Sequence, residues 1–326
     1  MFVHRGAKVF GKRDSFDIKS HFQNDRQGLL SYMHRHWQLY VMLLVPVSLI
    51  ITFNYVPIYG AIIAFKNFRV TKGIWGSDWV GFKYFEQFFR SPSSLTIIQN
   101  TVAISLYTIM ASIPFPVLLA VALNETRRHR LKKTVQMVTY APHFISTVVL
   151  VSMVMQFLDP RIGFINRIIS MLGGESRAFM AIEQYFIHIY VWSGIWQSTG
   201  FDAIIYLATL SGISLELYEA ARIDGANKWQ KVCYIDIPAI IPTLSILLIL
   251  NFGQLMDVGF EKTYLLQNAA NINSSEVIST YVYKIGLINM NLSFSTAVNL
   301  FNSVVNTALI VLVNFAAGRL SKTSLF

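Results

Sequence analysis

Long apolar stretches without a single Asp, Glu, Lys or Arg dominate the pattern of the chain. A helix needs about 20 mainly apolar residues to cross the hydrocarbon core of a bilayer. Five charge-free runs reach that length, at 36–65, 91–124, 134–158, 237–256 and 285–318. A sixth run is interrupted only by Asp202, which separates 184–201 from 203–215. The pattern therefore predicts an all-α integral membrane protein with six transmembrane helices, over about 40–64, 97–122, 136–158, 186–209, 239–259 and 295–317.

The composition supports this prediction and excludes other classes of protein. Of the 326 residues, 54% are hydrophobic and 13% are charged, whereas a soluble domain carries about 25% charged residues. The mean hydropathy of +0.47 also excludes a disordered or fibrous chain. A single cysteine, Cys233, excludes an intramolecular disulfide and a multi-cysteine metal site.

The placement of Lys and Arg predicts the orientation, because these residues accumulate in cytoplasmic loops. The loops and termini on one side hold 17 of the 27 Lys and Arg residues, and those on the other side hold 10. The richer set comprises 1–35, 125–133, 216–236 and 319–326. Both termini are therefore predicted to be cytoplasmic, with a basic tail over 1–36 and a transmembrane domain over 37–326. The net charge of +10 is explained by topology, and no nucleic-acid partner is predicted.

Two segments outside the spans leave alternatives open. The tail is basic and partly apolar, so it either lies in the headgroup region or is a loosely ordered topology signal. The aromatic-rich segment 75–89 is extracytoplasmic in this topology. It either rests on the membrane interface or helps to receive a substrate-binding protein.

No arrangement of catalytic or metal-ligating residues is found in the sequence. Residues 6–12 fit the start of a phosphate-binding loop, but Arg13 replaces the Ser or Thr that would hold Mg²⁺. The seven histidines include no H-E-x-x-H pair. His143 and His188 are interpreted as packing residues, with pH sensing as the alternative. Any ATP hydrolysis must therefore come from a separate subunit.

Several amide side chains lie within the predicted spans. Such groups either form hydrogen bonds between helices or line a polar substrate path. Asp202 and Asp257 are costly if they face lipid, which favours a functional role. On this evidence alone the chain could equally be an ion-coupled secondary transporter or channel that works without an ATPase.

The loop between the fourth and fifth spans carries the most specific pattern. It reads Glu219-Ala220-Ala221-Arg222-Ile223-Asp224-Gly225-Ala226, followed after eight residues by Ile235-Asp236-Ile237-Pro238. The alanines predict a short helix with a small-residue surface that fits a narrow cleft. Gly225 permits the φ angle that ends or turns this helix. Pro238 suits the first turn of the fifth span.

This segment resembles the EAA loop of the membrane subunits of bacterial ATP-binding-cassette importers. Their pattern is E-A-A, two residues, D-G-A, eight residues, I-x-L-P, and the one departure here is Ile237 in place of Leu. The resemblance implies the type I importer permease fold, with residues 216–242 as a coupling loop that seats in a groove of the ATPase.

The resemblance also implies roles for the residues of the loop. Glu219 would make the polar contact with the ATPase, and Gly225 would set the bend between two short helices. Asp224 would either cap the turn or contact the partner. The predicted coupling residues are Glu219, Ala220, Ala221, Asp224, Gly225, Ala226 and Pro238.

The first span and its exit, residues 55–68 and 72–77, resemble the polysaccharide-importer subgroup, which includes the first permease subunit of an alginate importer. The fifth span lines the central cavity in related sugar permeases. The predicted substrate path comprises Gln197, Asn251, Gln254, Asp257 and Asn299. An anionic sugar would be repelled by Asp257, which argues against a contact role for that residue.

The implied function is a non-catalytic permease subunit that imports an oligo- or polysaccharide, with alginate favoured, across the bacterial inner membrane. The implied partners are a second homologous permease, two ATPase subunits that bind ATP and Mg²⁺, and an extracytoplasmic solute-binding protein. No cofactor is expected on this chain.

Overall fold

The computed structural model describes residues 34–321, and the chain divides into two compact units between Gly60 and Ala61. In the first unit the described residues form helix α2, Trp37–Ile50, continued by a π-helical turn at Ile51–Tyr55. A 3₁₀ helix, Val56–Phe65, then leads into the second unit. The basic tail predicted over 1–36 lies outside the described residues, apart from 34–36.

The second unit begins with short elements that carry most of the aromatic-rich segment. Strands β1, Lys66–Asn67, and β2, Asp78–Trp79, pair antiparallel, and helix α3, Gly73–Gly76, lies between them in sequence. Helix α4, Lys83–Arg90, follows. The ring of Phe65 stacks on Trp79 at a centroid distance of 5.7 Å, so the aromatic side chains stabilise the hairpin.

The segment predicted as the second span, 97–122, is an almost continuous helical run. Helix α5, Ser94–Ser112, is followed after one residue by α6, Pro114–Glu125. Pro114 starts α6 because its missing N–H is not needed in the first turn of a helix.

The segment predicted as the third span, 136–158, is sharply bent. Helix α7, His129–Tyr140, continues into a 3₁₀ turn, Ala141–Phe144. It meets helix α8, Thr147–Phe157, at an angle of 101°. Pro142 lies in the 3₁₀ turn, and Ser146 caps α8 by accepting from the Val149 amide. A single straight helix over this segment is therefore not observed.

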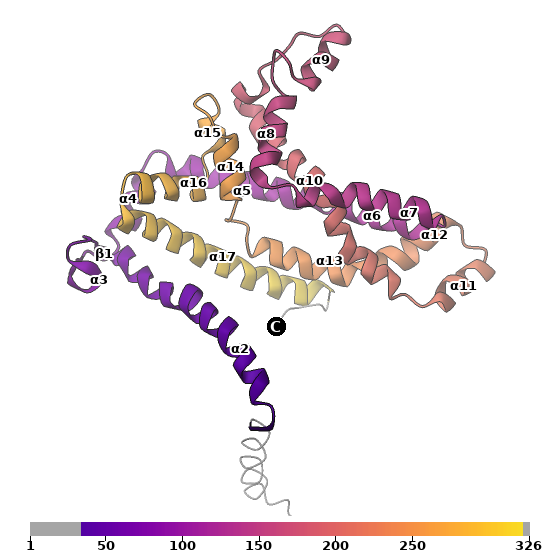
Figure 1. Ribbon diagram of the computed structural model, residues 1–326, viewed down its shortest axis with the longest axis horizontal. Helices are drawn as coiled ribbons and strands as arrows, with labels where there is room; N and C mark the ends of the chain where they lie inside the picture. Colours follow the sequence, from indigo (N-terminus) through magenta and orange to yellow (C-terminus); the bar gives the residue numbers. More distant parts are fainter. Residues whose placement is uncertain (1–33, 322–326) are drawn as a thin grey trace, which may run out of the picture. The chain divides into compact units, whose positions relative to one another are not determined.

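Helix α9, Phe164–Met171, and a 3₁₀ turn, Phe179–Ala181, precede α10, Glu183–Ser211, which contains the predicted fourth span. Helix α10 packs along α6 (Figure 1). Its backbone also approaches α7 closely. A Cβ atom on Gly200 would lie 2.0 Å from the Thr139 carbonyl oxygen, so glycine is required at this contact.

The predicted coupling loop contains helix α11, Leu215–Ile223, and helix α12, Lys228–Lys231. A π-helical turn, Val232–Asp236, joins α12 to α13, Ile237–Phe252. The helical run of the fifth span thus starts at Lys228 and ends at Phe252. It ends earlier than the predicted limit of 259, and turns at 253–256 follow α13.

The short helices that follow pack against α5, α8 and α10. They are α14, Phe260–Leu266, α15, Ile272–Ser275, and α16, Ile278–Tyr283, then a π-helical turn at Lys284–Ile288. The last helix, α17, spans Leu292–Ser321 and packs against α13, α4 and α16.

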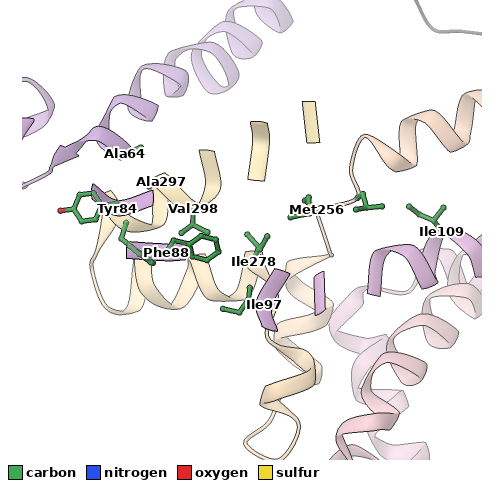
Figure 2. Packing of buried hydrophobic residues seen from close by; sticks show 11 residues of the cluster. Ala64, Tyr84, Phe88, Ile97, Ile109, Met256, Ile278, Ala297 and Val298 are labelled. Carbon is green, nitrogen blue, oxygen red and sulfur yellow. The ribbon is translucent and has the colours of Figure 1, made fainter. Parts of the chain in front are cut away.

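The largest buried cluster joins elements that are far apart in the sequence (Figure 2). Phe88 of α4 and Ile97 of α5 are fully buried together with Ile278 of α16 and Val298 of α17. Burial of such side chains contributes roughly 1.5–3 kcal/mol each. This cluster therefore holds α16 against α4, α5 and α17.

The helices of the described residues agree with a multi-span membrane protein. Four are long and apolar enough to cross a bilayer, or up to six if each of two bent pairs is one span. The second bent pair consists of α10 and α11, which meet at 72°. The bend at Gly212 turns the chain from the fourth span into the loop.

Candidate functional site

The EAA loop, residues 216–242, is built from two short helices and a tight turn. Gly225 has φ +76°, in the left-handed region that residues with a Cβ atom rarely adopt. The turn is closed by the Ala226 amide, which donates to the Ala221 carbonyl at 2.8 Å. This is the α-helix ending that favours glycine, and it agrees with the bend predicted at Gly225.

The second short helix has its own cap. The Asn227 side chain accepts from the Gln230 amide at 2.9 Å, and the Gln230 side chain accepts from the Asn227 amide at 2.8 Å. This reciprocal pair is a capping box. The cap is thus formed by Asn227, whereas Asp224 is exposed at the end of α11. The other alternative for Asp224, contact with a partner, stays a prediction.

The outer surface of the loop is unusually apolar for a solvated turn. Ile223 is 87% exposed and Trp229 is 78% exposed. Glu219 and Ala220 are also exposed, whereas Ala221 and Ala226 are half-buried. Exposed large apolar side chains are typical of a protein-binding surface.

The inner surface of the loop is held by polar contacts. The Tyr218 hydroxyl donates to Asp236 Oδ1 at 2.5 Å, which ties the start of the loop to its end. Burial of the hydroxyl and its bond to Asp236 raise the pKa of Tyr218 to about 12. The Tyr218 side chain therefore remains a hydrogen-bond donor at any physiological pH.

Two further contacts connect the loop to the end of helix α6. Asn124 Nδ2 donates to the Tyr218 hydroxyl oxygen at 3.4 Å. Lys231 Nζ lies 3.6 Å from Glu125 Oε1, with the side chains 10% and 24% exposed respectively. Pro238 lies in the first turn of α13, as its position in the motif predicts.

Three of the predicted substrate-path residues line one cavity. Asn251, Gln254 and Asp257 meet there with Thr108 of α5 and Tyr190 of α10, in a volume of about 140 Å³. The pocket therefore lies where the end of α13 meets α5 and α10. Its lining is mixed, with amide, hydroxyl and carboxylate groups beside apolar side chains, and this mixture suits a polar solute.

Asp257 is already engaged within the chain. Its Oδ1 accepts from Asn302 Nδ2 at 2.7 Å, and its Oδ2 accepts from Asn306 Nδ2 at 3.0 Å. Both donors lie on α17 and are almost fully buried. These bonds brace the segment after α13 against α17, so the carboxylate of Asp257 has a structural partner that the sequence pattern did not reveal.

The other two predicted path residues lie elsewhere. Gln197 Nε2 donates to the Ile145 carbonyl at 2.8 Å and so supports the bend between α7 and α8. Asn299 lines a second cavity of about 410 Å³, with Tyr283 and Thr296. The structure thus brings three of the five residues together and separates Gln197 and Asn299 from them. Their roles in transport stay predictions.

The two histidines near membrane depth take part in packing contacts. His143 stacks on Phe201 at a centroid distance of 3.8 Å. His188 Nδ1 lies 3.1 Å from the Tyr107 hydroxyl oxygen, which also accepts from Trp192 Nε1 at 3.0 Å. These contacts support the packing interpretation of both residues.

The motif did not identify Tyr218, Asp236, Glu125 and Lys231. Asp236 stands at the variable position of the I-x-I-P segment, where the family pattern prescribes no residue type. A charged residue directly before the apolar run 237–256 was the available signal, because such a residue is costly to bury without a partner.

Together, the helical fold, the spans and the EAA loop define a membrane permease of an importer. Residues 112–322 match the family described as "Binding-protein-dependent transport system inner membrane component". The chain belongs to this family, and it is a multi-pass inner-membrane permease of the sugar-importing ATP-binding-cassette transporters.

Two relatives and one solved structure show which members of the family this chain is similar to. The chain is 38% identical over 301 residues to the polygalacturonan/rhamnogalacturonan transport system permease protein YteP of Bacillus subtilis, covering 92% of this chain and 94% of the relative. Protein LplB of the same organism is 36% identical over 91% of this chain and 93% of its own length. In a crystal structure of a bacterial transporter that imports the acidic polysaccharide alginate, one chain is 35% identical with a TM-score of 0.83. The match covers 90% of this chain and 99% of that chain.

Proposed function

We propose that this chain forms part of the translocation path for an acidic oligo- or polysaccharide, with alginate as the substrate, and that ATP hydrolysis by separate subunits drives transport. It would pair with a second homologous permease, above two ATPase subunits that bind ATP and Mg²⁺, and receive substrate from an extracytoplasmic solute-binding protein. Both termini would be cytoplasmic, and the chain itself would carry no cofactor.

The geometry of the EAA loop is the observation that carries this proposal. On this loop Glu219, Ile223 and Trp229 are all exposed. Its inner face is tied to the helices by Tyr218 and Lys231. A rigidly attached loop with an apolar outer surface suits a partner that pushes on it, whereas a secondary transporter has no use for such a surface.

The size of the polar pocket supports pairing with a second permease. Pockets for small molecules have volumes of roughly 300–1,000 Å³, and the pocket of Asn251, Gln254 and Asp257 measures about 140 Å³. A saccharide chain would therefore need a path completed by another subunit.

The substrates in the names of similar proteins support the proposal of an acidic substrate. A crystal structure with the same 35% identity and TM-score of 0.83 holds a bacterial alginate transporter with its alginate pentasaccharide-bound periplasmic protein. Polygalacturonan and alginate are both polymers of uronic acids, so the same negative charge recurs on every residue of such a chain. The bonds from Asn302 and Asn306 occupy both oxygens of Asp257, so this carboxylate has a role within the chain that requires no contact with an acidic sugar.

The test is purification of this chain from its native membrane in mild detergent, followed by an ATPase assay with solute-binding protein. The expected result is co-purification of an ATPase that alginate oligosaccharides stimulate. Stimulation by polygalacturonate oligosaccharides alone would keep the mechanism and exclude alginate. If the chain purified alone and moved solute in vesicles without ATP, the proposal would be wrong and the secondary-transporter alternative would replace it.

A further inference from the structure

The EAA loop is connected to the helices of the transmembrane domain in two ways. The chain itself connects the loop to α10 through Gly212 and to α13 through the π-helical turn 232–236. Helix α6 has no such connection, because it precedes the loop by 90 residues, from Glu125 to Leu215. Apolar packing places Ala120 of α6 and Ile240 of α13 in one buried cluster, and polar side-chain contacts join the last residues of α6 to the loop.

The polar contacts involve neighbouring side chains of α6 and the loop. Tyr218 of α11 donates to Asp236 and accepts from Asn124 at the end of α6. Lys231 of α12 pairs with Glu125, the last residue of α6. The end of α6 accordingly lies beside α12 (Figure 1). Four elements therefore contribute to this group: α6, α11, α12 and the π-helical turn that contains Asp236.

Burial distinguishes this group from ordinary surface pairs. Asp236 is 0% exposed, and its Oδ2 is buried with no hydrogen-bond partner among the described residues. Lys231 is 8% exposed. Exposed ion pairs contribute little, whereas breaking a buried pair leaves an uncompensated charge. The group is thus sensitive to small displacements of either side.

We propose that Tyr218, Asp236, Glu125 and Lys231 form a clasp that makes the EAA loop and the end of α6 move together. These are positioning residues: they touch no substrate, and they act by passing the displacement of the loop to the second span. The proposal rests on the proposed function, because it requires an ATPase that moves the loop.

The test uses the complete transporter, with the second permease and the ATPase subunits, in proteoliposomes. The readout is the number of substrate molecules transported per ATP hydrolysed. A substitution that only reduces the amount of assembled transporter would leave this ratio unchanged, because the ratio is set by the transporters that do assemble. The variants are Tyr218→Phe, Glu125→Lys, Lys231→Glu and the combined charge exchange Glu125→Lys/Lys231→Glu. Tyr59→Phe and Lys133→Glu, both at exposed positions outside the loop, are the matched controls.

Each single variant is expected to lower the transport-to-ATP ratio about 2- to 30-fold, the range for substitutions along a coupling network. The charge exchange should restore the ratio of Lys231→Glu to within about 2-fold of the wild type, because it re-forms the pair with opposite polarity. The control variants should leave the ratio unchanged. If the single charge variants do not assemble, the charge exchange and Tyr218→Phe still decide the question.

Two results would overturn the clasp. One is an unchanged ratio in Tyr218→Phe and in the assembled single charge variants; the other is a charge exchange that assembles but stays uncoupled. Failure of the proposed function would look different, because the wild-type transporter would then show no substrate-stimulated ATPase activity.

Discussion

Asn302 donates from Nδ2 to Oδ1 of Asp257 over 2.7 Å, and this bond joins the middle of α17 to the segment that follows α13. Asn306, one turn further along α17, donates to the other carboxylate oxygen. The second amide has a further role, because its Oδ1 accepts from the Met256 amide at 2.9 Å. Both oxygens of the Asp257 carboxylate thus accept hydrogen bonds from amides of the same chain, and such bonds stabilise the charged carboxylate.

Asn306→Ala is expected to destabilise the protein. The substitution removes the bond to Asp257 Oδ2 and leaves the buried Met256 amide without its partner. An unsatisfied buried group costs about 1–3 kcal/mol, and thermal unfolding in detergent measures the loss. Ser303→Ala is the control, because its exposed hydroxyl bonds only to its own helix. Equal stability of the two variants would show that the Asp257 bonds contribute nothing.

Gly225 gives a graded prediction for the loop. At φ +76° asparagine is tolerated better than other non-glycine residues, and β-branched residues are the least tolerated. Gly225→Asn should keep most of the substrate-stimulated ATPase activity, whereas Gly225→Val should lose most of it, with strain of roughly 1–2 kcal/mol or more. The measurement is ATPase stimulation in the assembled transporter. If Val were tolerated as well as Asn, the left-handed turn would not be required.

The sequence predicted much of this architecture because lipid imposes strict rules. The charge-free runs predicted helices long and apolar enough to cross a membrane, since backbone groups in lipid must be satisfied within helices. The EAA pattern identified Gly225 and Pro238, because a positive φ and the first turn of a helix each restrict the residue type. Here local chemistry decides the structure, and one sequence is enough to detect it.

The remaining features depend on contacts between distant residues. The bend of 101° between α7 and α8 is fixed by Gln197, which donates to the Ile145 carbonyl 52 positions away. Pro142 and Ser146 marked helix ends but could not give the angle. Asp257 was expected to be a costly charge, and its partners Asn302 and Asn306 could not be assigned without a fold.

Gly200→Ala is predicted to prevent correct assembly of the helices. The new Cβ would lie 2.0 Å from the carbonyl oxygen and 2.3 Å from the carbonyl carbon of Thr139, so the backbones of α7 and α10 must separate. Overpacking of a core costs about 1–3 kcal/mol and sometimes more. Size-exclusion chromatography after purification measures the yield of monodisperse protein. Gly60→Ala, with open space around its Cβ, should keep a normal yield.

Lys262 should make stability depend on alkaline pH. Its Nζ donates to the Tyr190 carbonyl at 2.7 Å, and burial lowers the pKa of Lys262 to about 8. The unfolded chain keeps the ordinary higher value, so it binds more protons than the folded chain between about pH 8 and 10.5. Stability therefore rises with pH across this window, by about 1–3 kcal/mol.

The matched variant for this prediction is Lys262→Met, which keeps the length of the side chain and removes the charge. Its free energy of unfolding should lack that rise, whereas Lys133→Met, at an exposed position, should keep it. Denaturant unfolding at pH 7.5, 9 and 10.5 measures the difference. The same pH dependence in Lys262→Met and in the wild type would show that another group titrates.

The polar pocket gives a test of which predicted path residues contact substrate and which support the fold. Asn251 and Gln254 line the cavity and are exposed, so alanine at either position removes a polar contact without a buried unsatisfied group. Loss of a hydrogen bond worth about 0.5–1.5 kcal/mol predicts a KM for transport that is about 2- to 13-fold higher, with unfolding unchanged.

Gln197→Ala should behave in the opposite way, because the Gln197 amide donates to the Ile145 carbonyl. Transport by the assembled variant should then be normal, while its thermal stability falls. Transport kinetics in proteoliposomes, measured beside thermal unfolding for all three variants, test the assignment. If Gln197→Ala raised KM at unchanged stability, the path would run past the bend of α7 and α8 instead of through the cavity beside α13.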